Sequence, residues 1–194
     1  MAKAPTSEVL KLGTAGSPAR LSFADKLYKA KAFSPGQEAK FQSSFLLDPS
    51  NKEHAAQIAA VKKAAIDLIQ GEKLDPKDFK LCFGKGDDKK YDGYAGMVYV
   101  TASNSVRPTV VNRRNNPVVE GDEQAPYSGC YVIGSVTLWL QNNQYGKRIN
   151  ANLRAVQFVK DGQAFGAQAV NADDEFEPLE GDAGGTASPD PFDL

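Results

Sequence analysis

Alternation of apolar and polar side chains dominates the second half of the chain. The segments CYVIGSVTLWLQ (130–141) and RINANLRAVQFVKDG (148–162) alternate with a period of two, and the turn residues NNQYGK separate them. In a β-strand this period places successive side chains on opposite faces. The pattern therefore predicts a long antiparallel hairpin over 130–162.

Shorter segments of the same kind precede this hairpin. Strands are expected at 19–31 (with a bend), 39–48, 79–84, 95–103 and within 107–129, with turns at SPGQ (34–37) and GKGDDKKYDG (84–93). Residues 1–18 are rich in Ala, Ser, Gly and Pro, which predicts a flexible N-terminal arm.

One segment has helical spacing instead. Ser50 is the expected N-cap, and Glu53 follows at the distance of a capping box. Gly71 marks the expected end. The apolar residues between them recur every three or four positions: Ile58, Val61, Ala65, Leu68 and Ile69.

Frequent strands around a single helix predict a mainly β protein. The best match is an OB-fold, a five-stranded Greek-key barrel, with one inserted α-helix at about 50–71. This domain is expected to span 19–170 and to be followed by a disordered acidic C-terminal tail, 171–194.

Charge is divided between these two parts. All 23 lysines and arginines lie at or before Lys160, whereas eight of the 24 acidic residues lie in 173–193, so the body carries +7 and the tail −8. A cationic body joined to an anionic tail indicates a polyanionic ligand. No apolar run approaches the ~20 residues of a membrane helix, and the N-terminus lacks a secretion signal. We therefore expect a cytoplasmic protein with no membrane partner, in which Cys82 and Cys130 are buried thiols.

Candidate catalytic groups are sparse. His54 has no cysteine or carboxylate at metal-ligand spacing, and GKGDDKK lacks the pattern of a phosphate loop. A nuclease could use Asp87, Asp88 and Asp92 to gather a divalent cation, but Lys89 and Lys90 are interleaved with them, which favours a solvated loop. The sequence thus predicts no catalytic residue, no metal and no cofactor.

Cations and aromatic residues, by contrast, are interleaved throughout the β-rich region. Single-stranded nucleic acid needs cations along its phosphates and flat side chains on which unpaired bases stack. The predicted DNA-binding residues are Lys85, Lys89, Lys90, Tyr94, Tyr99, Arg107, Arg113, Arg114, Tyr127, Tyr131, Trp139, Lys147, Arg148 and Arg154, with Tyr91 and Tyr145 nearby.

Parity within the hairpin separates two faces. One face of its first strand is expected to be core: Cys130, Val132, Val136, Leu138 and Leu140. The other carries Tyr131, Ile133, Ser135, Thr137 and Trp139. In the second strand one face carries Asn150, Asn152, Arg154, Val156 and Phe158, and the other Ala151, Leu153 and Ala155. The Tyr/Trp and Asn/Arg faces predict a nucleic-acid platform; burial beneath the helix or arm is the alternative for Tyr131 and Trp139.

The segment APYSGCYVIGSVTLWLQNNQYGKRINANLRAVQFVKDG (125–162) and the ending DPFDL resemble the OB-fold single-stranded DNA-binding proteins of tailed bacteriophages, which have acidic C-terminal tails. The resemblance implies coating of single-stranded DNA during replication and recombination. It also implies that phage or host replication proteins bind the tail through Asp190, Phe192 and Asp193. Two residues follow Phe192 here, whereas many relatives end on the aromatic.

The leading hypothesis is therefore a non-catalytic, largely sequence-independent single-stranded DNA-binding protein of phage replication, located in the cytoplasm of the infected bacterial host. Its tail would contain a charge block that competes with DNA (173–182), a spacer (183–189) and a partner-binding hook (190–194). Binding of duplex DNA and formation of a homo-oligomer stay open. The alternative is a structural virion or assembly protein whose acidic tail keeps it soluble.

Overall fold

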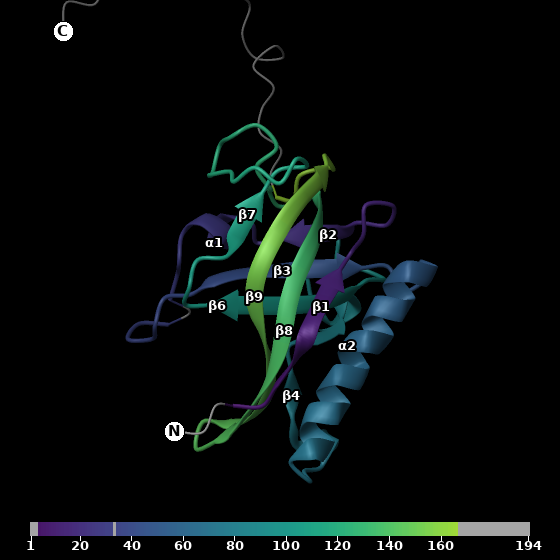
Figure 1. The fold of residues 1–194 in the computed structure, drawn as a ribbon, viewed down its shortest axis with the longest axis vertical. Coiled ribbons are helices and arrows are strands. Elements are labelled where there is room, and N and C mark those ends of the chain that lie inside the picture. Colours follow the sequence, from purple (N-terminus) through teal and green to yellow (C-terminus); the bar gives the residue numbers. More distant parts are fainter. Residues whose placement is uncertain (1–3, 33, 167–194) are drawn as a thin grey trace, which may run out of the picture.

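The computed structural model describes residues 4–32 and 34–166 (Figure 1). Within them the elements run β1 (Thr6–Leu12), β2 (Ala19–Ser22), α1 (Asp25–Tyr28), β3 (Phe41–Leu47), α2 (Lys52–Gly71), β4 (Lys80–Leu81), β5 (Phe83–Lys85), β6 (Val98–Asn104), β7 (Thr109–Val111), β8 (Tyr131–Asn143) and β9 (Gly146–Lys160). Two short 3-10 turns lie at Pro76–Asp78 and Gly86–Asp88.

Five of these strands close into a barrel. β2 pairs with β3, β3 with β6, β9 with β8 and β8 with β2, all antiparallel, and a parallel pairing of β6 with β9 completes the ring. This Greek-key barrel is the predicted OB-fold. The remaining strands extend it: β1 pairs with β8, β5 with β6, and β4 and β7 with β9.

The long helix α2 is inserted between β3 and β6 and lies beside β1 and β8 (Figure 1). Its N-cap is Asn51 rather than Ser50, because the Asn51 side chain accepts from the amides of Glu53 and His54, whereas Ser50 is bound to the Asp48 carboxylate. Glu53 accepts from the Thr14 hydroxyl at 2.6 Å, so no capping box forms. The buried face follows the predicted spacing: His54, Ile58, Val61, Ala65 and Ile69.

The N-terminal region is not a loose arm between residues 6 and 12. These residues form β1, which supplies hydrogen-bond partners to an edge of β8 that would otherwise be open. The Ser7 hydroxyl accepts from the Leu138 amide at 2.9 Å, and Leu12 is fully buried. Residues 19–31 also differ from the expected bent strand, since Phe23, with φ of 60°, ends β2 in a turn that leads into α1.

The hairpin confirms one predicted face and corrects the other. Cys130, Val132, Val136, Leu138 and Leu140 are all buried in the core. Ser135 of β8 pairs with Ala155 of β9, and Val136 of β8 pairs with Leu153. Arg154 of β9 is left without an opposite residue and forms a β-bulge. The extra residue reverses the parity, so Val156 and Phe158 enter the core instead of sharing a face with Asn150 and Asn152.

Candidate nucleic-acid interface

A cleft of about 760 Å³ opens on the outside of the barrel, above β3 and β6. The β2–β3 connection supplies Lys31, Lys40 and residues 36–38, the strands supply Gln42 and Ser103, and Tyr145 comes from the β8–β9 turn. Gln42 and Ser103 are opposite each other in the strand pairing, and Tyr145 is 74% exposed. We call this the β3–β6 cleft.

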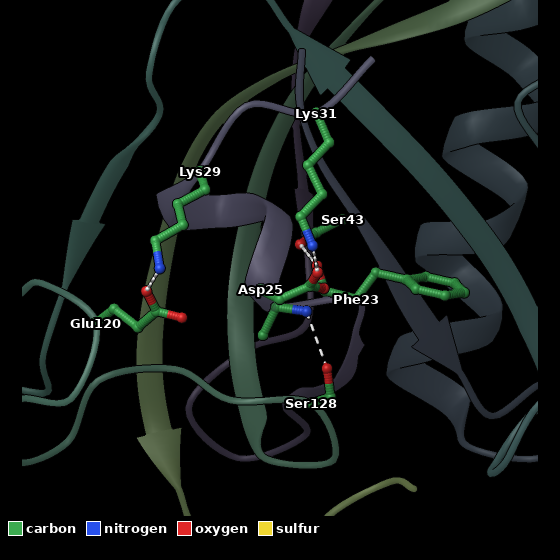
Figure 2. A network of polar contacts seen from close by, with 8 residues as sticks. Phe23, Asp25, Lys29, Lys31, Ser43, Glu120 and Ser128 are labelled. Carbon is green, nitrogen blue, oxygen red and sulfur yellow. Dashed lines mark hydrogen bonds and ion pairs between the residues drawn. The ribbon is translucent and has the colours of Figure 1, made fainter. Parts of the chain in front are cut away.

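Two lysines of the cleft, Lys31 and Lys40, and Lys29 outside it form exposed ion pairs with carboxylates. Lys31 binds Asp25 at 2.7 Å and Lys29 binds Glu120 at 3.2 Å, as Figure 2 shows, while Lys40 lies 3.9 Å from Glu38. All six side chains are substantially exposed, and such surface pairs contribute about 0–1 kcal/mol each. A phosphate group can therefore replace these carboxylates at little cost.

Strand register extends the polar floor of the cleft around the barrel. Gln42 lies opposite Ser103, Ser103 opposite Asn152, and Asn152 opposite Thr137. These four side chains, which we call the polar row, face outward from β3, β6, β9 and β8. Trp139 and Asn150 are the next opposed pair along β8 and β9. Trp139 is half-buried beside Thr6 of β1, so its ring is part of the outer face and not of the core.

A second row of side chains on the outer side of the barrel lies nearer the other end of β3 and β6, and one of its members, Leu46, is buried. Tyr131 lies opposite Arg20, Arg20 opposite Leu46, and Leu46 opposite Tyr99. Tyr99 continues into a chain of aromatic rings, with centroids 6.0 Å apart for Tyr99–Tyr94, 5.4 Å for Tyr94–Tyr91 and 5.2 Å for Tyr91–Phe23. We call Phe23, Tyr91, Tyr94 and Tyr99 the aromatic strip.

Three lysines lie over these rings. The Nζ atoms of Lys26, Lys89 and Lys160 are 5.2, 5.3 and 4.9 Å from the ring centroids of Phe23, Tyr99 and Tyr131. Among the residues that the structure describes, none of the three forms an ion pair. Cations and aromatic rings therefore lie side by side here.

Two predicted stacking residues have structural roles instead. Tyr94 is only 2% exposed, so its ring cannot receive a base in this conformation. Tyr127 is half-buried against the core, and its hydroxyl binds the Asp161 carboxylate at 3.1 Å and the Gly162 carbonyl at 2.9 Å. Partial burial raises the pKa of Tyr127, so the phenol remains a hydrogen-bond donor.

The predicted arginines do not gather in one place. Arg113 and Arg114 project from a loop that Asn112 holds by accepting from the amides of Arg114 and Asn116. This loop follows β7, which pairs with β9 at Ala155–Gln157, and Figure 1 shows β7 and the β8–β9 turn at opposite ends of the ribbon. Arg154 is exposed at the bulge between them.

The remaining predicted cations are spread along the strand ends. Lys147 forms an ion pair with Asp78 at 2.9 Å, and Arg148 is exposed opposite Gln141. Lys85, Lys90 and Arg107 are exposed, at the end of β5, in the loop after it and after β6. The cations therefore surround the outer face without forming a single cluster.

Sequence reasoning missed several residues of this surface. Gln42 and Ser103 carry no signal of their own, because only the pairing of β3 with β6 brings them together. Arg20 alternates correctly with Leu21 in β2, and this parity could have marked it as outward-facing. Phe165 lies after the last strand and reaches Arg20 only because the chain folds back.

The carboxylates of Asp87 and Asp92 and the ring of His54 form hydrogen bonds with backbone groups. Asp87 and Asp92 accept from the amides of Gly96 and Gly166, at 2.8 and 3.0 Å. His54 is buried, with Nδ1 accepting from the Asp48 amide and Nε2 facing the Ser17 carbonyl. Among residues 4–32 and 34–166 no group of three His, Cys, Asp or Glu could hold a metal ion. Nor does that part of the chain contain a helix long and apolar enough to span a membrane.

Known proteins share this architecture. Solved structures include the single-stranded DNA-binding protein from bacteriophage Enc34 in complex with ssDNA, with a TM-score of 0.68, 29% identity and coverage of 81% of this chain and 89% of that one. Gp2.5, a single-stranded DNA-binding protein encoded by bacteriophage T7, has a TM-score of 0.50 over 96% of this chain and 99% of that one. At 15% identity this second likeness supports the fold alone.

The sequence comparisons are more specific. Protein p50 of Acyrthosiphon pisum secondary endosymbiont phage 1 is 37% identical over 172 residues, which cover 82% of this chain and 90% of that protein. A family model described as the ssDNA-binding protein of Enterobacter phage Enc34 matches residues 11–186. These similarities give no support to a structural virion protein. The chain belongs to the Enc34 family of phage single-stranded DNA-binding proteins.

Proposed function

We propose that this protein coats single-stranded DNA during phage replication and recombination in the host cytoplasm, without catalysing a reaction. The observation that carries the proposal is the outer face of the barrel, where the β3–β6 cleft adjoins the polar row and the exposed Tyr91 of the aromatic strip lies farther along. Rings that accept a stacked base favour unpaired strands, because the faces of paired bases are already covered by their neighbours.

Weak sequence dependence follows from the kind of side chains present. Stacking on Tyr or Trp is available to every base, and lysines contact phosphates that are the same in every sequence. The polar row offers short side chains of Thr, Asn, Ser and Gln, spread over four strands. No arginine lines the described part of the cleft, so the bidentate contact of an arginine with guanine is absent there.

The acidic tail lies outside the described residues, and its role is also a proposal. Residues 163–166 are the last ones described, and they lie against Arg20, Ser128 and Asp92 on the face of the barrel that carries the aromatic strip. The chain thus leaves the barrel beside the proposed DNA surface, with eight acids following between 173 and 193. We propose that this charge block competes with phosphates and that Asp190, Phe192 and Asp193 bind replication partners.

The first test is fluorescence anisotropy with labelled oligo(dT), using the full chain and residues 1–171 over a series of salt concentrations. We expect both to bind at low salt, with log Kd rising linearly with log salt, and the shorter chain to bind more tightly. Failure of both to bind would refute the function. Equal affinity of the two would refute only the competition by the tail.

The second test uses Tyr145, the most exposed ring of the cleft. Tyr145→Ala should raise the Kd for oligo(dT) roughly 5- to 150-fold, which corresponds to the ~1–3 kcal/mol of one stacked base. Ile66→Ala is the matched control, since Ile66 is a 43% exposed apolar residue of α2 that is not part of the cleft. A duplex competitor in the same assay would show whether double-stranded DNA also binds.

A further inference from the structure

Phe165 is half-buried on the barrel surface, away from the main core. Its ring centroid is 4.4 Å from the Cζ atom of Arg20, so the ring and the guanidinium are in contact. The ring also lies directly on the backbone of Gly93, where an added Cβ would be 2.3 Å from the Phe165 Cζ. Gly93 has a φ of +76°, a conformation that side chains other than glycine rarely adopt.

Arg20 is held in place for this contact. Its Nε donates to the Gly129 carbonyl at 3.1 Å, and its Nη2 donates to the Gln163 carbonyl at 2.7 Å. The same guanidinium lies 5.8 Å from the ring centroid of Tyr131. The bond to Gly129 does not depend on residues 163–166, and a planar guanidinium is a surface on which nucleobases stack in single-stranded complexes. A phenyl ring on that surface occupies the position that a base would take.

Space for a flat ligand continues beside the phenyl ring. Phe165 lines two pockets, one of about 260 Å³ together with Phe23, Asp25, Tyr91 and Asp92, and one of about 340 Å³ together with Arg20, Gly93 and Asp92. Tyr91 is 54% exposed, which leaves much of its ring accessible. Lys26 and Lys160, over Phe23 and Tyr131, supply positive charge for a phosphate near this pocket.

The segment that carries Phe165 is attached by three hydrogen bonds and by packing on Gly93 and Gly129. The Phe165 amide donates to the Ser128 carbonyl at 3.0 Å, the Gly166 amide to the Asp92 carboxylate at 3.0 Å, and Gln163 accepts the bond from Arg20. Gln163, Ala164 and Gly166 are exposed, so water can replace these bonds. Gly162, by contrast, exchanges two hydrogen bonds with the Tyr127 hydroxyl, which would keep the chain anchored just before the segment.

We propose that Arg20 and Tyr91 form a nucleobase-binding site and that Phe165 fills it when no single strand is bound. The ligand is one unpaired base of the DNA, which displaces residues 163–166 and stacks on the guanidinium of Arg20. This inference rests on the proposed function and names a specific site within it. Phe165 then acts as a competitor of DNA that is built into the domain, before the acidic residues of the tail begin.

The first experiment measures oligo(dT) affinity of the full-length Phe165→Ala variant by anisotropy. Removing the competing ring should lower Kd at least fivefold, since one stacked base is worth roughly 5- to 150-fold. Tyr91→Ala should raise Kd, because it removes a wall of the site. Ile66→Ala should leave Kd unchanged, and circular dichroism would check that each variant is folded.

The second experiment reads the displacement directly by hydrogen exchange of the wild-type chain. Binding normally slows the exchange of amides that it covers. Here the amides of Phe165 and Gly166 should instead exchange faster at saturating oligo(dT), because they lose the Ser128 and Asp92 acceptors. The amide of Gly162, bonded to Tyr127, should stay protected and serves as the internal control.

The outcomes separate this inference from the function on which it rests. If the wild-type chain fails to bind oligo(dT) at low salt, the proposed function fails, and this site fails with it. If the wild type binds but Phe165→Ala binds equally well or more weakly, only the competitor role is overturned. Slower exchange of Phe165 and Gly166 on binding would overturn it as well, because the segment would then be covered rather than displaced.

Discussion

Gly134 offers a stringent test of the barrel, because a fully buried ring packs against its backbone. Phe45 of β3 points into the core, and a Cβ added to Gly134 of β8 would lie 2.4 Å from its Cε1 and 2.7 Å from its Cζ. In the closed ring, β2 lies between β3 and β8. Phe45 therefore reaches across β2 to β8 on the inner side of the barrel, a contact that depends on the pairing of β3 with β2 and of β2 with β8.

Gly134→Ala should destabilise the protein by about 1–3 kcal/mol, the usual cost of forcing extra volume into a packed core. The ring would have to move by about 1 Å to reach an ordinary carbon–carbon distance of about 3.5 Å, and Phe45 has no exposed side toward which to move. The lower conformational entropy of an unfolded chain with alanine offsets only ~0.4–1 kcal/mol of this. For a domain of this size Tm should fall by roughly 2–4 °C per kcal/mol.

Urea unfolding monitored by circular dichroism would measure the change, with Gly71→Ala as the matched control. Gly71 is at the exposed end of α2 with nothing within 4 Å of an added Cβ, so alanine there should be neutral or stabilising. Phe45→Leu removes the ring edge. The double variant should therefore lose less stability than the sum of the two single variants, by about 0.5–3 kcal/mol.

Two results would refute this reasoning. Wild-type stability of Gly134→Ala would mean that Phe45 does not lie on this glycine. Strict additivity of Gly134→Ala and Phe45→Leu would mean that the two residues do not touch, and the packing of Phe45 across β2 would have to be abandoned.

Three further predictions concern the cap, the thiols and the cations. Asn51→Ala should lower the free energy of unfolding in urea by about 0.5–2 kcal/mol, whereas Ser50→Ala should change it by less than about 0.5 kcal/mol. A larger loss for Ser50→Ala than for Asn51→Ala would mean that Ser50 is the N-cap. Burial raises the pKa of Cys82 and of Cys130 to about 12, whereas the thiols of an unfolded chain have a pKa near 8.5. The contribution of the buried thiols to the free energy of unfolding should therefore be complete below about pH 8.5 and fall by up to ~1.4 kcal/mol per pH unit per thiol toward pH 12. Cys→Ala variants should reduce this slope. Arg154→Ala should lower the slope of log Kd against log salt by about 0.7 if Arg154 contacts a phosphate, and an unchanged slope would remove it from the interface.

Local patterns of the sequence were sufficient for the elements that bury one face. The helix and the core face of β8 were predicted because a buried stripe fixes the period of its residues, as Ile58, Val61 and Leu138 show. The five-stranded barrel followed from the number and spacing of such segments. Cap identity was less certain, since Ser50 and Asn51 are both good N-caps and only the competing Asp48 carboxylate decides between them.

The register between strands that are far apart in the chain could not be predicted from the sequence. The bulge at Arg154 depends on how β8 and β9 align, and it moved Val156 and Phe158 from the expected polar face into the core. Strand β1 was read as an arm because its composition is ordinary for a loop, yet the open edge of β8 gives it partners. Tyr94 was predicted to be a stacking residue from its residue type, but the packing of neighbouring rings buries it.

The distance between the polar row and the second row gives an estimate of how many nucleotides the proposed DNA path would hold. On β3, Gln42 belongs to the polar row and the buried Leu46 to the second row, which Arg20 and Tyr131 continue, and four residues of a strand span about 13 Å. A strand of nucleotides with bases stacked at ~3.4 Å, or extended to about twice that, covers this distance with two to four nucleotides. OB-folds bind about 4–16 nucleotides, so the path must extend beyond β3. The polar row provides that extension, because it continues through Asn152 to Thr137, beside Trp139 and Asn150 on the long hairpin. Binding to oligonucleotides of increasing length should therefore strengthen well beyond four nucleotides before it reaches a plateau.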